Sequence, residues 1–203
     1  VVPMHTFGHP CRIDEIADIC KEWNIILIED TAEALGSSYK GKALGTFGDI
    51  AAFSFNGNKV ITTGGGGLIV SRHPEMITRA KHVTTTAKIP HPYEFSHSEI
   101  GYNYRMPNLN AALGCAQLEQ IDTYLTSKRE TAAQYKNFFS NRDEMFVDEP
   151  ENSKSNFWLN AIILKDHQER NSFLTAVNDE KVMTRPIWTL MNKLPMFQDC
   201  QCG

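Results

Sequence analysis

Residues 1–30 combine two apolar runs with an intervening segment in which apolar side chains recur at helical spacing. The first run, residues 1–8, is short, and residues 12–24 (RIDEIADICKEWN) then form the amphipathic pattern that predicts a helix. Residues 25–30 (IILIED) stay apolar until their last two positions, which is typical of a strand buried on both faces. This strand–helix–strand order predicts a βαβ unit, and therefore a parallel sheet with a right-handed crossover.

Two more strands follow a segment rich in turn-forming residues. Residues 40–49 (KGKALGTFGD) have turn chemistry, and residues 50–55 (IAAFSF) have the pattern of a short buried strand. Four consecutive glycines, residues 64–67, then reverse the chain, and residues 68–71 (LIVS) are predicted to form another strand. Residues 73–83 (HPEMITRAKHV) are predicted to be helical.

The second half of the chain begins with a segment that has no clear period. Residues 84–107 contain three prolines and many polar or aromatic side chains, and a stretch of this length is typical of a functional or partner-contacting loop. Residues 108–141 then predict one long helix, with Asn108 as its N-cap after Pro107.

After about residue 143 the pattern changes to that of a second α+β unit, which begins within or after the long helix. Residues 156–164 are strand-like, residues 167–179 are helical, and residues 182–188 are a further candidate strand.

Composition and charge argue against several classes of protein. The chain has 203 residues, 41% of them hydrophobic, and a net charge of −4, which does not suit a general nucleic-acid binder. No apolar run approaches the length that spans a bilayer, and the first residues lack the layout of a signal peptide. The cysteines are odd in number and widely spaced, so we expect neither a disulfide framework nor a metal site. We expect the protein to be located in a reducing cytoplasm. The cysteines are Cys11, Cys20, Cys115, Cys200 and Cys202.

Polar side chains follow two of the predicted strands. Asp30 ends one strand, and Ser54, Asn56 and Lys59 follow the next. Open parallel sheets bind ligands at the carboxyl ends of their strands, so these side chains could share a crevice. Taken singly, each has an ordinary explanation, since aspartates often cap helices and lysines are usually solvated. The glycines follow Lys59 rather than precede it, which does not match a P-loop and argues against nucleotide hydrolysis.

Three longer segments give the sequence a family resemblance. IEDTAEALGSSYKGKALGTFGD, FSFNGNKVITTGGGG and IGYNYRMPNLNAALGCAQLEQID resemble the DegT/DnrJ/EryC1/StrS sugar aminotransferases, which are fold-type-I enzymes that use pyridoxal 5′-phosphate (PLP). With the later TRPIW, they look most like the branch that acts on UDP-4-keto sugars of the legionaminic-acid and bacillosamine type. The resemblance implies an α/β fold: residues 1–124 form the C-terminal part of a large domain with a mostly parallel sheet, and residues 125–203 an incomplete small α+β domain.

The same resemblance implies the positions of a cofactor site. Lys59 matches the lysine that forms a Schiff base with PLP and shuttles a proton, which requires a neutral amine. Asp30 matches the acid that pairs with the protonated pyridine nitrogen and keeps the ring an electron sink. Ser54 matches the hydroxyl that binds the phosphate, and Asn56 is a weaker candidate from the same loop.

Two further matches concern the ring and the partner subunit. Glu33 occupies a position that usually carries glutamine or histidine near the ring hydroxyl, where a carboxylate repels a phenolate unless one of the two holds a proton. Asn103 matches an asparagine that reaches the phosphate from the neighbouring subunit, which implies a homodimer with shared active sites.

Candidate substrate residues have competing explanations. Arg105 and Arg185 could meet nucleotide phosphates, or form surface salt bridges. His5 lies near a strand end, as does the family's H-x-x-G segment, but a capping or packing role is equally open. Trp188 and Phe197 are expected in the core rather than against a sugar.

The resulting hypothesis is a PLP-dependent aminotransferase that moves an amino group from glutamate to C4 of a nucleotide-linked 4-keto-6-deoxy sugar, for bacterial surface glycans. The alternatives are a PLP-dependent sugar dehydratase, which typically has histidine at the position of Lys59, and a non-catalytic binding relative. Family members are longer at both ends, so we expect a fragment that by itself binds PLP weakly or not at all.

Overall fold

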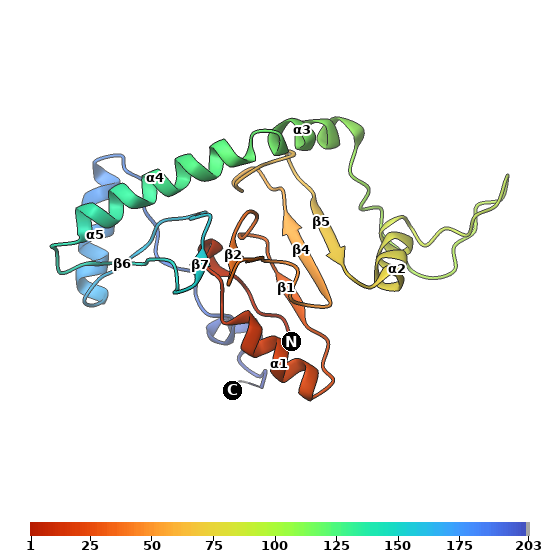
Figure 1. Cartoon of the computed structure of the whole chain (residues 1–203), viewed down its shortest axis with the longest axis horizontal. Coiled ribbons are helices and arrows are strands. Elements are labelled where there is room, and N and C mark those ends of the chain that lie inside the picture. Colours follow the sequence, from red (N-terminus) through yellow and green to blue (C-terminus); the bar gives the residue numbers. More distant parts are fainter. Residues whose placement is uncertain (202–203) are drawn as a thin grey trace.

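The computed structural model describes residues 1–201 and is organised around a three-stranded sheet of order β1–β4–β5 (Figure 1). The strands are β1 (Ile28–Asp30), β4 (Ile50–Ser54) and β5 (Gly67–Ser71). β1 and β4 are parallel, whereas β5 runs antiparallel to β4. The shared register places the carboxyl ends of β1 and β4 at one edge of the sheet.

The predicted βαβ unit is present, with a shorter first strand than expected. Met4 forms a parallel bridge with Asp30, and the helix α1 (Ile13–Glu22) connects the two segments. α1 packs its buried Ile13 and Cys20 into the hydrophobic core with Leu27. The first residues of the chain therefore lie beside β1 at the edge of the sheet, but they form an isolated bridge with it instead of a regular strand.

The expectation that residues 25–30 are buried on both faces is wrong. Only Ile28–Asp30 form a strand, and burial alternates along the segment. Leu27 and Glu29 face the core, whereas Ile26 and Ile28 are 55% and 37% exposed. Within the described residues, α1 and the core cover one face of this strand and leave the other open.

A small second sheet, of order β3–β2–β7, lies beside this core. β2 (Ser38–Tyr39) and β3 (Lys42–Ala43) form a tight hairpin inside the segment predicted as turns. Both central residues, Lys40 and Gly41, have positive φ, as a type I′ hairpin turn requires. β7 (Ser153–Lys154) comes from far along the chain and pairs with β2.

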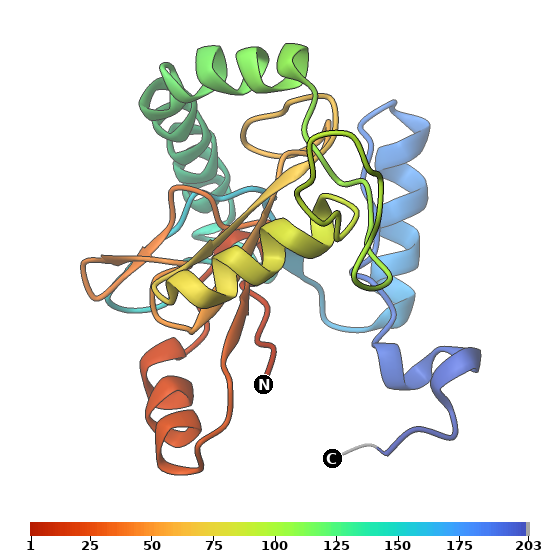
Figure 2. The same cartoon turned by 90° about the vertical axis from the view of Figure 1, so that its right-hand side faces the viewer.

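The predicted helix after β5 is α2 (Pro74–Thr84), and the predicted loop after it is an extended arm, residues 85–107. Figures 1 and 2 show the arm reaching beyond α2, away from the sheet. Isolated bridges Thr85–Asn103 and Lys88–His97 hold its two sides together. The arm therefore has defined shape without regular secondary structure.

The predicted long helix is divided into α3 (Asn108–Leu118) and α4 (Ile121–Phe139). Gln120 leaves helical dihedral angles at the junction, with φ −112° and ψ 5°. Asn108 is the first helical residue and Pro107 occupies the N-cap, so the predicted cap is displaced by one residue.

The C-terminal part contains less strand than predicted. β6 (Met145–Phe146) pairs with β8 (Ile162–Ile163), and α5 (His167–Asp179) begins at Asp166, which accepts a hydrogen bond from the Glu169 N–H. Residues 155–158 are buried but form polar contacts instead of a strand, and residues 182–188 are irregular. Short 3-10 helices complete the described chain: Thr6–Gly8, Met191–Lys193 and Pro195–Phe197.

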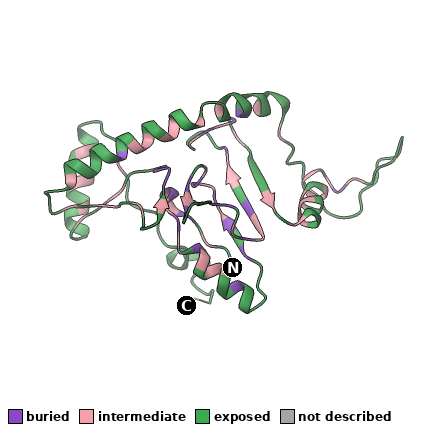
Figure 3. Ribbon diagram, in the orientation of Figure 1, coloured by how far each residue is buried: buried purple, intermediate pink, exposed green. Residues whose placement is uncertain are grey.

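Burial is concentrated in one region. Figure 3 shows the buried residues gathered around α1, β1 and the β2–β3 hairpin, whereas α3, α4 and α5 are exposed over most of their length. None of the helices in residues 1–201 has the length and hydrophobicity needed to cross a membrane.

Candidate active site

The carboxyl edge of the sheet opens into a cavity of about 970 Å³. Asp30 is the last residue of β1 and Ser54 the last of β4, and both line this cavity. The backbone of three consecutive glycines, 65–67, and Arg105 of the arm line it as well. The topology thus brings an acid, a hydroxyl and a stretch of bare backbone to one place, as expected for an open α/β sheet.

Asp30 has one carboxylate oxygen available to a ligand. Its Oδ1 accepts a hydrogen bond from the Ala32 N–H at 3.0 Å, which fixes the side chain in an Asx turn. Its Oδ2 has no hydrogen-bond donor among residues 1–201. A carboxylate held in this way suits a protonated nitrogen presented from the cavity.

The glycine run shapes the opposite wall of the cavity. Gly64 and Gly66 adopt positive φ values of 79° and 106°, which favour glycine. A Cβ on Gly67 would lie 2.4 Å from the Phe53 carbonyl oxygen, so the strand pair excludes a side chain there. Beside this turn, Ser54 Oγ accepts the Asn56 N–H at 3.3 Å and keeps its own proton for donation.

Lys59 lies in the turn after β4 and is half-buried. Its Nζ is 4.0 Å from the centre of the Trp158 ring, a cation–π contact. The Trp158 Nε1–H donates to the Asn58 carbonyl oxygen at 2.7 Å, so the indole is tied to the residue beside the lysine. The amine is therefore positioned by an aromatic face far away in the sequence.

Glu33 connects the acid and the amine electrostatically. It is 9% exposed, and its Oε2 accepts the Phe7 N–H at 2.7 Å. Burial raises the pKa of Glu33; among the smaller effects, the positive charge of Lys59 lowers it and the negative charge of Asp30 raises it. The charges of Lys59 and Asp30 therefore both act on Glu33, although Lys59 does not line the cavity that Asp30 and Ser54 line.

His5 lies elsewhere, in a buried polar cluster. It is fully buried, its Nε2 lies 3.3 Å from Glu29 Oε2, and it does not line the cavity. Its Nδ1 accepts the Cys11 N–H at 3.3 Å, which corresponds to the capping and packing alternative. Sequence reasoning missed the partner, Glu29, whose only signal was an acid inside an apolar strand.

Glu29 is a buried anion with saturated hydrogen bonding. Its two oxygens accept N–H groups from the turn after β3, at 2.6 to 2.8 Å. Burial raises the pKa of Glu29, but His5 and these N–H groups outweigh it and hold the pKa below its usual range. The donors are Gly45, Phe47 and Gly48.

The remaining predicted site residues are more exposed. Asn56 turns its amide toward Asn58 Oδ1 at 3.3 Å, within its own loop. Asn103 and Arg105 are exposed on the arm, where Arg105 donates to the Thr85 carbonyl oxygen at 3.4 Å. Arg185 is exposed in the irregular C-terminal segment and does not line the cavity.

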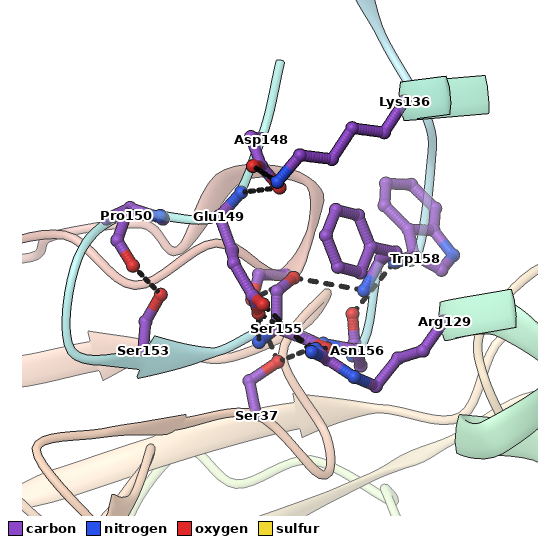
Figure 4. Close-up of polar contacts among 12 residues, drawn as sticks. Ser37, Arg129, Lys136, Asp148, Glu149, Pro150, Ser153, Ser155, Asn156 and Trp158 are labelled. Carbon is purple, nitrogen blue, oxygen red and sulfur yellow. Dashed lines mark hydrogen bonds and ion pairs between the residues drawn. The ribbon is translucent and has the colours of Figure 1, made fainter. Parts of the chain in front are cut away.

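Sequence reasoning did not anticipate a polar network that joins the loop after Asp30 to Trp158, and Figure 4 shows its part around Ser155 and Asn156. Asn156 is buried and donates through Nδ2 to the carbonyl oxygens of Glu33 and Leu35, at 2.8 and 2.9 Å. Its Oδ1 accepts the Trp158 N–H at 2.8 Å. The same side chain thus joins the loop after Asp30 to the tryptophan that contacts Lys59.

α4 anchors this network through one ion pair. Arg129 donates two hydrogen bonds of 2.8 Å to the carboxylate of Glu149. Glu149 in turn accepts the Ser155 N–H at 2.6 Å. In Figure 4, Arg129, Ser155 and Asn156 converge on Ser37, which accepts the Asn156 N–H.

Trp188, which was expected in the core, is 54% exposed. It stacks on Trp158 with the rings 12° from parallel and their centres 6.3 Å apart. Phe7 packs against its ring at 5.6 Å. The prediction was wrong because residues 182–188 form no strand, and the Trp188 ring lies against Trp158 and Phe7 at the surface.

Comparisons with known proteins show the family of the chain. The profile of the DegT/DnrJ/EryC1/StrS aminotransferase family matches residues 1–202. GDP-perosamine synthase of Escherichia coli O157:H7 is 39% identical over 199 residues, which are 98% of this chain and 54% of that protein. UDP-4-amino-4,6-dideoxy-N-acetyl-beta-L-altrosamine transaminase of Campylobacter jejuni (strain 81-176) is 36% identical over 171 residues, or 84% of this chain and 42% of that protein.

A solved structure gives the same result for the fold. The crystal structure of the aminotransferase TlmJ from Streptoalloteichus hindustanus superimposes with a TM-score of 0.92 and 27% identity. The match covers 97% of this chain and 54% of TlmJ. The chain therefore spans about half the length of the relatives that it matches.

Proposed function

The chain belongs to the DegT/DnrJ/EryC1/StrS aminotransferase family, and from this premise we propose that it is the lysine-bearing part of a PLP-dependent nucleotide-sugar aminotransferase. The reaction transfers an amino group from glutamate to the C4 keto carbon of a nucleotide-linked 4-keto-6-deoxy sugar for bacterial surface glycans. The observation that carries the proposal is the position of Asp30 and Ser54 at the carboxyl ends of two parallel strands, where both line one cavity and Lys59 follows in the next turn.

The residues present fit the cofactor. Asp30 offers an unpaired carboxylate oxygen for a pyridinium nitrogen, and the Ser54 hydroxyl beside bare glycine backbone suits a phosphate. When bound, PLP supplies an electron sink for the carbon that loses or gains a proton. Asn56 is a secondary phosphate candidate, because its amide now bonds within its loop.

Lys59 carries the proton chemistry in this proposal. A lysine amine acts as nucleophile and as general base only when it is neutral, and as general acid when it is protonated. The Trp158 face holds the amine at one position, so that proton transfer occurs at a defined atom. Glu33 accepts the Phe7 N–H, and burial raises its pKa, which favours its protonated form relative to that of an exposed glutamate.

The assembly and location are also proposals. Asn103 is exposed on the arm, where it forms a bridge with Thr85, and this exposure supports a homodimer in which Asn103 reaches the partner's phosphate site. The four cysteines within the described residues are free thiols, which supports a cytoplasmic protein, while Cys202 lies outside the described residues. We also propose that residues 1–124 belong to the large domain and residues 125–203 to the small one. The two parts are in contact, because β7 of the second pairs with β2 of the first.

The test is amino transfer by the full-length protein. Lys59→Ala is expected to abolish transfer from glutamate to a panel of GDP-, UDP- and dTDP-linked 4-keto sugars, measured by mass spectrometry. Lys42→Ala is the matched control, because Lys42 also contacts an aromatic ring, at 4.4 Å from Phe47, but lies in the β2–β3 hairpin. Full amino transfer by the Lys59→Ala variant would contradict the proposal. If the wild type transfers no amino group and Lys59→Ala binds the nucleotide sugar as tightly as the wild type does, the result would favour a binding protein.

A further inference from the structure

Helix α4 carries a half-buried amine, Lys128, that the proposed chemistry does not use. Its Nζ donates to the Trp158 carbonyl oxygen at 3.2 Å and has no carboxylate partner among residues 1–201. The other basic side chains of the helix, Arg129 and Lys136, each pair with an acid. Burial lowers the pKa of Lys128, since no negative charge offsets the loss of water. Pairing of surface charges therefore does not explain why an amine stands at this position.

The contact of Lys128 is one of several that hold Trp158, a buried residue. The Trp158 backbone N–H donates to Asn156 Oδ1 at 2.8 Å, and its Nε1–H donates to the Asn58 carbonyl oxygen at 2.7 Å. Lys128 supplies the donor for the remaining polar group, the carbonyl oxygen. Removing that donor leaves a polar group of a buried residue unsatisfied, which weakens the attachment of Trp158 to α4.

The position of Trp158 in turn decides where the Lys59 amine lies. Lys59 Nζ is 4.0 Å from the centre of the Trp158 ring, and Lys59 has no carboxylate partner in the described part of the chain. The indole N–H also holds residue 58, which directly precedes the lysine. A shift of the Trp158 backbone therefore moves both the ring that the amine contacts and the turn that carries it. Displacing a reacting group by about 1 Å can lower a rate about 100-fold.

We propose that Lys128 is a positioning residue that keeps the Trp158 ring, and with it Lys59 Nζ, in place. This inference rests on the proposed function, in which Lys59 is the reacting amine. Lys128 does not line the cavity that Asp30 and Ser54 line, and its hydrogen bond ends on Trp158. Its effect on Lys59 therefore passes through the tryptophan.

The first experiment measures the accessibility of the Lys59 amine in the full-length protein freed of PLP. A limiting dose of N-hydroxysuccinimidyl acetate acetylates exposed amines, and peptide mass spectrometry compares Lys59 with the exposed Lys165 in the same sample. Lys128→Met keeps the apolar stem and removes the donor, so Lys59 should be acetylated about fivefold faster relative to Lys165.

Two further variants separate positioning from a general loss of stability. Lys128→Arg restores a donor and should return the Lys59 rate to within about twofold of the wild type. Lys136→Met removes a lysine of the same helix that pairs with Asp148, and it should leave the Lys59 rate unchanged. An unchanged Lys59 rate in Lys128→Met, or an equal rise for Lys59 and Lys165, would overturn the proposal.

A double-mutant cycle tests the route through Trp158. Trp158→Leu removes the aromatic face and should itself raise the acetylation rate of Lys59. Adding Lys128→Met to Trp158→Leu should then cause little further change, because the ring through which Lys128 acts is gone. Full additivity of the two substitutions would contradict this route.

Kinetics test the consequence for the proposed reaction. Lys128→Met should lower kcat for amino transfer about tenfold and leave KM for glutamate and for the nucleotide sugar nearly unchanged, because the reacting amine is displaced while the substrate contacts stay. An unchanged kcat would show that Lys128 has no positioning role in the reaction. If the wild type transfers no amino group, the proposed function fails, and the acetylation rates still decide whether Lys128 positions Lys59.

Discussion

At the scale of single residues, the candidate site combines acids in opposite environments. Glu29 and Glu33 are both buried beside Asp30, but Glu29 accepts three backbone N–H groups whereas Glu33 accepts one. The pKa of Glu29 is lowered as a result, and burial raises that of Glu33. The environment of Glu29 therefore favours its ionised form, whereas burial favours the protonated form of Glu33.

The lowered pKa of Glu29 predicts a pH-dependent stability. Because the folded pKa lies below the ordinary value of 4.5, the ionised carboxylate stabilises the fold above that value, and the contribution is lost as pH falls through the folded pKa. Glu29→Gln puts an amide donor among backbone N–H groups and should lower the free energy of unfolding at pH 7 by about 1–3 kcal/mol.

Urea denaturation of the full-length protein at several pH values measures this effect. The difference between wild type and Glu29→Gln should shrink as the pH falls below 4.5. The exposed Glu151→Gln serves as the control and should change little at any pH. A constant difference across the whole pH range would argue against an ionised Glu29 in the fold.

At the scale of elements, the site depends on a segment that lies outside the sheet. Residues 155–158 come after α4 and β7, and they pass between the loop after β1 and the loop that carries Lys59. Arg129 on α4 holds this segment through Glu149 and the Ser155 carbonyl oxygen. Helix α4 thereby contributes to the geometry of a site to which it supplies no ligand-facing residue.

Asn156→Ala tests the importance of this segment. The substitution leaves the carbonyl oxygens of Glu33 and Leu35 without their buried donor and should reduce the free energy of unfolding by about 1–3 kcal/mol. Chemical denaturation of the full-length protein measures the change. Asn171 is exposed, so Asn171→Ala should leave the free energy of unfolding nearly unchanged. Equal free energies of unfolding for the two variants would show that the hydrogen bonds of Asn156 do not stabilise the fold.

At the scale of the whole molecule, the sheet has one open apolar face. Large contiguous apolar patches usually mark a surface that another part or partner covers. The exposed apolar side chains on this face and the adjoining segments are Val2, Met4, Ile26, Ile28 and Ile69, and of these Val2, Ile28 and Ile69 also line the 970 Å³ cavity. The chain spans 54% of the GDP-perosamine synthase of Escherichia coli O157:H7, and we expect a segment or partner outside residues 1–203 to cover this face.

Residues 1–203 expressed alone should therefore bind PLP weakly or not at all and self-associate with rising concentration. The full-length protein should give a stable visible absorbance with PLP under the same conditions, which spectroscopy detects directly. Size-exclusion chromatography measures the association. A monomeric isolated chain that binds PLP as tightly as the full-length protein would contradict this prediction.

The sequence by itself determined the local elements and the family. Helical spacing predicted α1, α2 and α5, and the apolar runs predicted β4 and β5, because these patterns depend on neighbours in the chain. The segments around Asp30 and Lys59 carried the family resemblance, which the family profile confirmed.

Only the tertiary structure decided which side chains meet. Trp158 and Lys59 are 99 positions apart, and Asn156 lies 123 from Glu33, so no local period could pair them. The structure likewise reduced residues 25–30 to a short strand with one open face and buried His5 against Glu29. Periodicity records which residues prefer burial, whereas the contacts themselves depend on how distant segments pack.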